Sequence, residues 1–430
     1  MSNFNETSLI EPLLNNLKEL GYTTPTPIQT EAIPLLLEGH DLLGIAQTGT
    51  GKTAAFSLPI LQKIIEKKSH ALILAPTREL ATQIHESFEK YGKGLGIRSV
   101  VIFGGVGQSA QVKALKDGVN IIVATPGRLL DLQKQGHLKL NNIDTLVLDE
   151  ADRMLDMGFI DDLHAIIKSL PKDRQTMFFS ATMPGLVAAL ARKILKNPKR
   201  VEVTKNSSTA LNIDQKVIFC KREDKFQLLR KILKEEEREL VMIFTKTKNS
   251  ADKVKEYLLF HKIPSTVFHG DKTQIDRERA LHNFKTGSMK VMIATDIAAR
   301  GIDVQGVSHV INFELPMEAE SYIHRIGRTA RAGHDGVAIT LCDDSEAPNL
   351  ERIEKLINKK IPTEKYKGTP EQSGKWNQEG AIRVVKAPTP GKSQEKTAYL
   401  DHSKRQRVQE EGKKKPSHPG FRNNNKKKKK

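Results

Sequence analysis

The chain has 430 residues, 38% of them hydrophobic, and a formal net charge of +18. This length predicts two or three domains with buried cores. No apolar run approaches the length of a membrane-spanning helix, so we expect no membrane partner. The positive charge indicates an acidic partner, with nucleic acid ahead of a membrane surface.

The two cysteines, Cys220 and Cys342, lie in apolar strand-like runs and lack the spacing of metal ligands. We therefore expect both to be core residues of a protein in a reducing compartment. Residues 1–10 have neither the basic region nor the apolar region of a secretory signal, which favours a cytoplasmic location.

In chain order, the elements predict two parallel α/β domains. Residues 4–39 are predicted to form helices and turns, and apolar strand-like runs then alternate with amphipathic helices. Such alternation is typical of a parallel sheet covered on both faces. The expected strands are 42–45, 70–75, 98–103, 120–124, 144–148 and 175–179, and then 215–220, 240–245, 265–269, 290–295, 309–313 and 337–342.

The polar stretch 204–209 separates these two series, and the helix 347–359 closes the second. We therefore expect a first domain over 1–205, a linker over 206–213 and a second domain over 214–361. Residues 361–430 carry 19 Lys and Arg against 7 Asp and Glu, a net +12. With few apolar residues, 362–430 is predicted to be a disordered basic tail.

Residues 46–53 have the pattern of a phosphate-binding loop between a strand and a helix, although Ala46 replaces the usual first glycine. Backbone N–H groups of such a loop and the following helix N-terminus attract phosphates. Lys52 can reach the β- and γ-phosphates, and Thr53 can ligate Mg²⁺. The alternative is a glycine-containing turn without a ligand. The predicted nucleotide-binding residues here are Ala46, Gln47, Thr48, Gly49, Thr50, Gly51, Lys52 and Thr53.

A second acidic motif completes a nucleotide-hydrolysing site. The apolar strand 143–148 runs directly into Asp149, Glu150 and Asp152. Asp149 would hold Mg²⁺ through water, and Glu150 would orient and deprotonate the attacking water. An acidic surface turn is the alternative, but the presence of Lys52 upstream favours hydrolysis.

The sequence Asp149-Glu150-Ala151-Asp152 and its neighbouring motifs resemble the DEAD-box RNA helicases over residues 4 to about 360. The resemblance implies two tandem RecA-like domains around a cleft for ATP and RNA. It implies that Tyr22 stacks on adenine, that Gln29 bonds its Hoogsteen edge, and that Gly301 and Asp303 complete the ATP site, with Asp303 on the ribose.

The resemblance also implies an RNA-binding set. In the first domain these residues are strand ends with a hydroxyl, an arginine or free backbone N–H groups, which are the donors that phosphates use. The set comprises Pro76, Thr77, Arg78, Gly104, Gly105, Thr125, Pro126, Gly127 and Arg128, and in the second domain Thr245, Gln274, Arg277 and Thr295.

Three arginines, Arg325, Arg328 and Arg331, are spaced one helical turn apart and are predicted to share a helix face. Such a face is usually only solvated, but it can also supply arginine fingers to a phosphate loop in another domain. The resemblance implies that Arg328 and Arg331 are the fingers. It further implies that ATP hydrolysis is coupled to domain contact through Asp152, Ser180, Thr182, His324 and Arg325.

Within the family, residues 148–159 and 103–106 resemble the bacterial RhlE-type subgroup. The expected function is an ATP-dependent RNA helicase that binds single-stranded RNA, opens short duplexes and acts on ribosomal precursor particles or with RNA-decay proteins. Two alternatives remain open: an ATP-gated RNA clamp with little unwinding, and a DNA-translocating motor.

Overall fold

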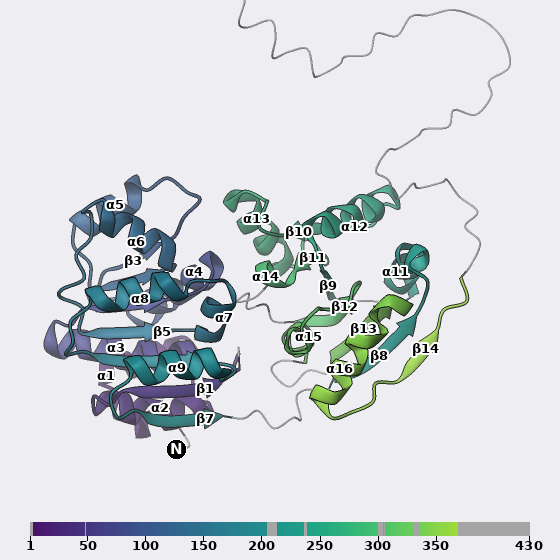
Figure 1. Ribbon diagram of the computed structural model, residues 1–430. Helices are drawn as coiled ribbons and strands as arrows, with labels where there is room; N and C mark the ends of the chain where they lie inside the picture. Colours follow the sequence, from purple (N-terminus) through teal and green to yellow (C-terminus); the bar gives the residue numbers. More distant parts are fainter. Residues whose placement is uncertain are drawn as a thin grey trace, which may run out of the picture. The chain divides into compact units, whose positions relative to one another are not determined.

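The computed structural model describes residues 3–47, 49–203, 213–235, 239–299, 304, 306–330 and 336–368. In these ranges the chain forms two seven-stranded sheets whose strand pairs are all parallel (Figure 1). We call the part up to Val203 the first domain and the part from Ile213 the second domain. The predicted α/β fold with two parallel sheets is confirmed.

The first domain has the strand order β3-β4-β2-β5-β6-β1-β7. Its strands are β1 (Leu42–Ala46), β2 (Ala71–Leu74), β3 (Ser99–Ile102), β4 (Ile121–Ala124), β5 (Thr145–Leu148), β6 (Gln175–Ser180) and β7 (Lys199–Val203). Its helices are η1 (Phe4–Glu6), α1 (Glu11–Glu19), α2 (Pro27–Leu37), α3 (Lys52–Lys67), α4 (Arg78–Tyr91), α5 (Ser109–Lys116), α6 (Pro126–Lys134), α7 (Ala151–Asp156), α8 (Ile160–Ser169) and α9 (Gly185–Ile194).

The second domain has the equivalent order β10-β11-β9-β12-β13-β8-β14. Its strands are β8 (Ile213–Phe219), β9 (Leu240–Thr245), β10 (Thr266–Phe268), β11 (Val291–Thr295), β12 (Val307–Asn312), β13 (Gly336–Cys342) and β14 (Thr363–Lys365). Its helices are η2 (Arg222–Asp224), α11 (Lys225–Glu235), α12 (Lys248–Phe260), α13 (Gln274–Lys285), α14 (Asp296–Ala299), α15 (Ala319–Ile326), η3 (Asp344–Glu346) and α16 (Ala347–Ile357).

The apolar strands are buried because helices cover both faces of each sheet. In β2, Ile73 packs in a core with α1 to α4, whereas its neighbours Leu72 and Leu74 pack in a separate core with α6 to α9. Successive side chains of a strand point to opposite faces, so a strand covered twice must be apolar throughout. This explains why the sequence shows continuous apolar runs at the central strands.

Two edge strands differ from the sequence prediction. No strand was predicted at β7, and Thr363–Lys365, which the prediction placed in the tail, forms β14 beside β8. Both edge strands are largely exposed and polar, so they carry no apolar pattern, and backbone pairing to one neighbour defines them. Residues 206–212 of the predicted linker and 369–430 of the predicted tail lie outside the described residues.

The cysteines lie in the core, as predicted. Cys220 and Cys342 are both buried and carry free thiols. Burial raises the pKa of Cys220 to about 11 and that of Cys342 to about 12, so neither thiol ionises at neutral pH. Both therefore act as small apolar core residues.

Gly44 is required by close packing in the middle of β1. A Cβ at this position would lie 2.5 Å from the Phe179 ring, which is buried against Phe56. We predict that Gly44→Ala lowers the free energy of unfolding by about 1–3 kcal/mol through overpacking, measured by urea denaturation. Gly185→Ala is the matched control, because nothing lies within 4 Å of a Cβ there. Equal losses in both variants would contradict the packing argument.

Candidate functional site

The predicted site residues follow the carboxyl ends of neighbouring strands. In the first domain the phosphate loop follows β1, Asp149 follows β5 and Ser180 ends β6, and these three strands are adjacent. The predicted RNA-binding residues follow β2, β4 and β3, which are adjacent at the other end of the sheet. Ligands of open parallel sheets bind at this edge. The topology therefore places the predicted nucleotide-binding residues and the predicted RNA-binding residues at two different parts of this edge.

The phosphate loop leaves a buried ammonium group available to an anion. Gly51 has φ +94°, and α3 begins at the next residue, Lys52. The Lys52 side chain is 5% exposed, and its Nζ makes no hydrogen bond with any described residue. The Asp149 Oδ1 atom lies 3.8 Å from this Nζ. A buried cation without a hydrogen-bond partner is costly, so its position fits a bound phosphate group. Thr48 lies outside the described residues.

Three carboxylates are buried together beside Lys52. Asp149, Glu150 and Asp152 are all buried, and burial raises the pKa of Asp149 to about 6, although Lys52 opposes the shift. Glu150 has φ +52° and its Oε2 forms an ion pair with Arg153 Nη1 at 2.9 Å. Buried carboxylates this close together would repel one another if all were ionised, and the cations of Lys52 and Arg153 offset that repulsion.

Asp152 joins the acidic motif to the end of β6. Its Oδ2 accepts hydrogen bonds from the backbone N–H and the hydroxyl of Thr182, both at 2.9 Å, and from the Ala181 N–H at 3.2 Å. The Ser180 hydroxyl donates to the Thr182 carbonyl at 2.7 Å. The structure therefore brings the three predicted coupling residues of the first domain into one network.

Gln29 connects α2 to the phosphate loop. Its Oε1 accepts from the Thr26 N–H at 2.9 Å, and its Nε2 donates to the Gly51 carbonyl at 3.1 Å. One lone pair and one N–H of this amide remain for a base. Tyr22, the second predicted adenine contact, is 42% exposed, so its ring is accessible to a ligand.

The predicted RNA-binding residues of the first domain lie where strands end and helices begin. The Thr77 hydroxyl accepts from the Leu80 N–H at 3.2 Å and caps α4, which places Arg78 in the first turn. Gly105 has φ +79°, a conformation that favours glycine, and the Arg78 guanidinium occupies the space where a Cβ would lie. Arg128 donates to the Val106 carbonyl at 3.3 Å. Gly104, Thr125, Pro126 and Gly127 lie at the same strand ends, as does Pro76.

In the second domain, the predicted RNA-binding residues belong to three adjacent strands. Thr245 ends β9, Thr295 ends β11, and α13 after β10 carries Gln274 and Arg277. The Arg277 guanidinium lies 4.9 Å from the centre of the Phe268 ring and forms an ion pair with Glu79 at 2.8 Å.

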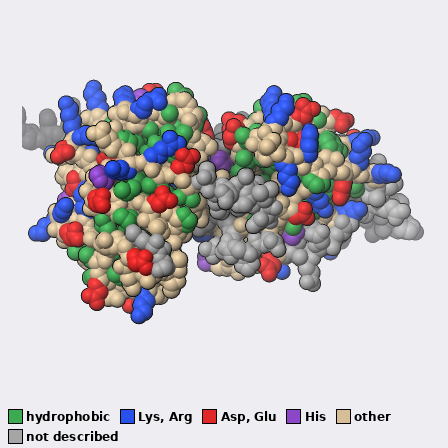
Figure 2. All heavy atoms as spheres, turned by 90° about the horizontal axis from the view of Figure 1, so that it is seen from below, with side chains coloured by type: hydrophobic (Ala, Val, Ile, Leu, Met, Phe, Trp, Pro, Cys, Tyr) green, Lys and Arg blue, Asp and Glu red, His purple; other side chains and the backbone are tan. Residues whose placement is uncertain are grey.

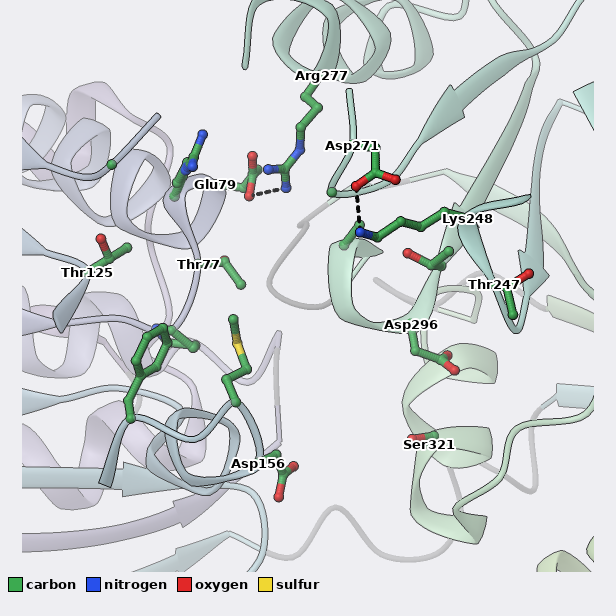
Figure 3. A pocket seen from close by; sticks show the side chains of 18 of the residues that line it. Thr77, Glu79, Thr125, Asp156, Thr247, Lys248, Asp271, Arg277, Asp296 and Ser321 are labelled. Atoms are coloured by element: carbon green, nitrogen blue, oxygen red, sulfur yellow. Dashed lines mark hydrogen bonds and ion pairs between the residues drawn. The ribbon is translucent and has the colours of Figure 1, made fainter. Parts of the chain in front are cut away.

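Most of the predicted RNA-binding residues line one pocket of about 1110 Å³ (Figure 3). They are Pro76, Thr77, Arg78, Gly104, Thr125, Gly127, Arg128, Arg277 and Thr295. Figure 3 also shows the ion pair of Lys248 with Asp271 at 2.5 Å on the second-domain side. Gly105, Pro126, Thr245 and Gln274 do not line this pocket.

The predicted arginine face of one helix is wrong. Helix α15 ends at Ile326, and Gly327, whose N–H bonds the Ile323 carbonyl at 2.9 Å, caps its end. Arg328 therefore lies in the following turn, where its Nε donates to the His324 carbonyl at 3.2 Å. Arg331, Gly301 and Asp303 lie outside the described residues.

Arg325 is buried and links two parts of the second domain. Its side chain is 1% exposed and makes a bidentate ion pair with Asp296, at 2.5 and 2.7 Å. Its Nη1 also donates to the Glu314 carbonyl at 2.6 Å. Arg325 thus connects α15 to the end of β11, which fits its predicted coupling role.

Sequence reasoning missed several partners of these residues. Glu79, Arg153 and Asp296 form the ion pairs described above with Arg277, Glu150 and Arg325. Only Arg153 had a sequence signal, because it lies three residues after Glu150, a spacing at which helical side chains can meet. The other two partners are distant in sequence and needed the folded structure.

Comparison with known proteins identifies the family. The DEAD/DEAH box helicase model matches residues 26–190, and the helicase conserved C-terminal domain model matches residues 224–333. The ATP-dependent RNA helicase CshA of Listeria monocytogenes is 42% identical over 389 residues, covering 90% of this chain and 74% of that protein. The chain belongs to the DEAD-box RNA helicase family.

Two further similarities agree with this assignment. The DEAD-box ATP-dependent RNA helicase CshA of Bacillus cereus is 43% identical and covers 84% of this chain and 69% of that protein. A structure of Dbp5 from S. cerevisiae with RNA and ADP BeF3 is 35% identical, with a TM-score of 0.75, covering 85% of this chain and 96% of that chain.

These findings confirm three predictions for this DEAD-box helicase: tandem RecA-like domains, the enzyme class of an ATP-dependent RNA helicase, and RNA as partner. The RhlE-type subgroup is not supported, because the relatives described above are named CshA.

Proposed function

We propose that Lys52, Asp149 and Glu150 form the hydrolytic centre of this helicase, and that Arg328 and Arg331 complete it. The observation that carries this proposal is the buried Lys52 ammonium, which makes no hydrogen bond within the described residues and lies beside Asp149. In this centre Lys52 holds the β- and γ-phosphates. Glu150 orients the attacking water and accepts its proton, and the arginines stabilise the charge that develops on the transferred phosphoryl group.

The residues present fit one Mg²⁺ ion held together with the nucleotide. Thr53 is the second residue of α3, directly after Lys52, and the buried Asp149 carboxylate lies 3.8 Å from the Lys52 ammonium group. Mg²⁺ is usually bound by one or two protein oxygens, with waters and substrate phosphates as its other ligands. Among the described residues, no group of three or more His, Cys, Asp or Glu side chains is placed so that it could hold a metal ion by itself. When bound, the ion would neutralise charge on the phosphates.

We further propose that adenine is read by Tyr22 and Gln29 and that the pocket of Figure 3 takes the sugar-phosphate backbone of single-stranded RNA. Its lining supplies hydroxyls, arginines and strand-end backbone groups, which bind phosphate and sugar irrespective of base, so sequence preference is expected to be weak. A strand bent to fit this surface cannot remain in an A-form duplex, so a few base pairs open locally.

A direct test compares RNA with DNA of the same sequence as activators of ATP hydrolysis, together with unwinding of a short RNA duplex. We expect RNA to stimulate hydrolysis strongly and the duplex to open only with ATP. Equal stimulation by DNA would favour a DNA-translocating motor. ATP-dependent RNA binding without duplex opening would favour an RNA clamp.

The cellular role we propose is that of a cytoplasmic helicase acting on ribosomal precursor particles or with RNA-decay proteins. In the part of the chain that the structure describes, no helix is long and apolar enough to cross a membrane. The RhlE-type subgroup stays a prediction based on residues 148–159 and 103–106. Crosslinking RNA to the protein in cells and sequencing it would identify the targets.

The basic tail is proposed to tether RNA. Lys and Arg side chains lie among Asp and Glu side chains on the face shown in Figure 2, whereas residues 361–430 carry a net +12 of the +18. For a single strand, each phosphate contact adds about 0.7 to the slope with which the logarithm of the RNA-binding constant falls against the logarithm of the salt concentration. We predict that deleting residues 369–430 flattens this slope and raises the RNA concentration for half-maximal ATPase activity, with the rate at saturating RNA nearly unchanged.

The end point of this deletion matters, because β14 pairs with β8 through hydrogen bonds such as Tyr366 N–H to the Phe219 carbonyl at 2.9 Å. A deletion from residue 362 removes this strand and serves as the control for loss of structure. If the shorter deletion leaves the salt dependence of RNA binding unchanged, the tail does not bind RNA and only increases solubility.

A further inference from the structure

Tyr91, the last residue of α4, contacts the exposed ring of Tyr22. The two ring centroids are 5.9 Å apart and the planes are inclined by 84°, an edge-to-face contact. The Tyr91 hydroxyl donates to the Tyr22 hydroxyl at 3.5 Å. Tyr91 is 6% exposed, whereas Tyr22 is 42% exposed. A fixed ring therefore supports one that is accessible to solvent.

The same helix anchors both tyrosines. The Asn16 side chain on α1 donates to the carbonyls of Tyr91 and Lys93, at 2.8 and 2.9 Å. The Tyr22 N–H bonds the carbonyl of Leu17, the next residue of α1, at 2.9 Å. These bonds hold the backbones of the two tyrosines against α1. The position of the Tyr22 ring then depends on its side-chain contact with Tyr91.

This contact has a physical consequence for a ligand that stacks on Tyr22. An exposed aromatic side chain loses rotamer freedom when a ligand stacks on it, and a ring that is already held loses less. The Tyr91 hydroxyl can donate to Tyr22 because a tyrosine is protonated at neutral pH, and burial raises its pKa further. A buried hydroxyl also keeps its partner, since losing it would leave a polar group unsatisfied.

We propose that Tyr91 is a positioning residue that holds Tyr22 in the orientation for stacking on the nucleotide base. This inference rests on the proposed function, in which Tyr22 contacts adenine. The phosphates bind elsewhere, at Lys52 and the loop before it. Tyr91 should therefore affect affinity for the base-bearing nucleotide, leaving affinity for a bare polyphosphate and the rate of the chemical step unchanged.

The test measures binding of ADP and of inorganic tripolyphosphate to the full chain by titration calorimetry. Tyr91→Phe keeps the ring and removes only the hydroxyl, and Tyr22→Phe removes the same contact from the exposed side. We expect each change to weaken ADP binding about two- to tenfold, the range of one hydrogen bond. Tripolyphosphate binding should not change, and KM for ATP should rise without a change in kcat.

A double-mutant cycle sharpens the test, because both single changes break one contact. The variant with both changes should have the same affinity for ADP as the single variant that binds ADP less tightly, because the contact is already lost in each single variant. Tyr257→Phe is the matched control, since it removes a buried tyrosine hydroxyl from α12 in the second domain. Unchanged ADP binding by Tyr91→Phe, equal weakening of ADP and tripolyphosphate, or additive effects in the cycle would each overturn the inference.

These outcomes are distinct from a failure of the proposed function. A wild-type chain that binds ADP but shows no RNA-stimulated hydrolysis contradicts the proposed hydrolytic centre, while the calorimetric cycle still decides the role of Tyr91. A wild-type chain that hydrolyses ATP with RNA, and whose ADP affinity does not depend on the two tyrosines, overturns only the inference.

Discussion

Replacing Glu150 by glutamine should reduce ATP turnover by roughly 10²- to 10⁴-fold, the usual contribution of a general base. Glu150 is buried next to Asp149 and Arg153, so an amide of the same shape fits the site. It cannot accept a proton from water, but it leaves Lys52 and the phosphate loop unchanged. We therefore expect ATP-dependent RNA binding to persist, measured by fluorescence anisotropy beside a phosphate-release assay.

Lys52→Ala provides the contrast, because it removes the buried ammonium that holds the phosphates and should abolish both RNA-dependent turnover and ATP binding. Asp161→Asn is the matched control for a carboxylate-to-amide change, since Asp161 is exposed on α8. Near-normal hydrolysis by Glu150→Gln would remove Glu150 from the role of base.

Replacing Arg328 by alanine should reduce RNA-stimulated hydrolysis by roughly 10³- to 10⁵-fold, the contribution of an arginine finger. Arg328 is buried in the turn after α15 in the second domain, whereas the phosphate loop belongs to the first. A cation from one domain can act on a nucleotide in the other only when RNA and ATP bring the domains together. Basal ATP binding should therefore remain in Arg328→Ala, and Arg331→Ala should behave in the same way.

Arg279→Ala is the matched control, because Arg279 is an exposed arginine on α13. A first domain ending at residue 203 gives a second comparison: it should bind nucleotide weakly and show no stimulation by RNA. Full RNA-stimulated hydrolysis by that domain alone would contradict the two-domain mechanism.

The candidate nucleotide-binding residues could be recognised from the sequence because they lie in short runs of consecutive residues. The phosphate loop and the acidic motif are short runs of residues bounded by apolar strands, and strand, loop and helix follow one another directly along the chain. A central strand must be apolar on both faces, so β2, β5 and β9 also had a clear pattern in sequence. The order of strands and helices thus indicated the fold class, and the resemblance of the motifs to the DEAD-box family implied the enzyme class and RNA as partner.

Contacts between distant residues needed the tertiary structure. The ion pair of Arg325 with Asp296 and the contact of Tyr91 with Tyr22 join side chains that are 29 and 69 residues apart. The edge strand β14 is defined by pairing with β8, and its own residues carry no apolar signal. Arg328 was wrongly placed on a helix face because spacing alone does not show that the helix ends at Ile326. Periodicity along a chain reports which side chains share a face of a regular element, whereas the partners they meet depend on how the elements pack.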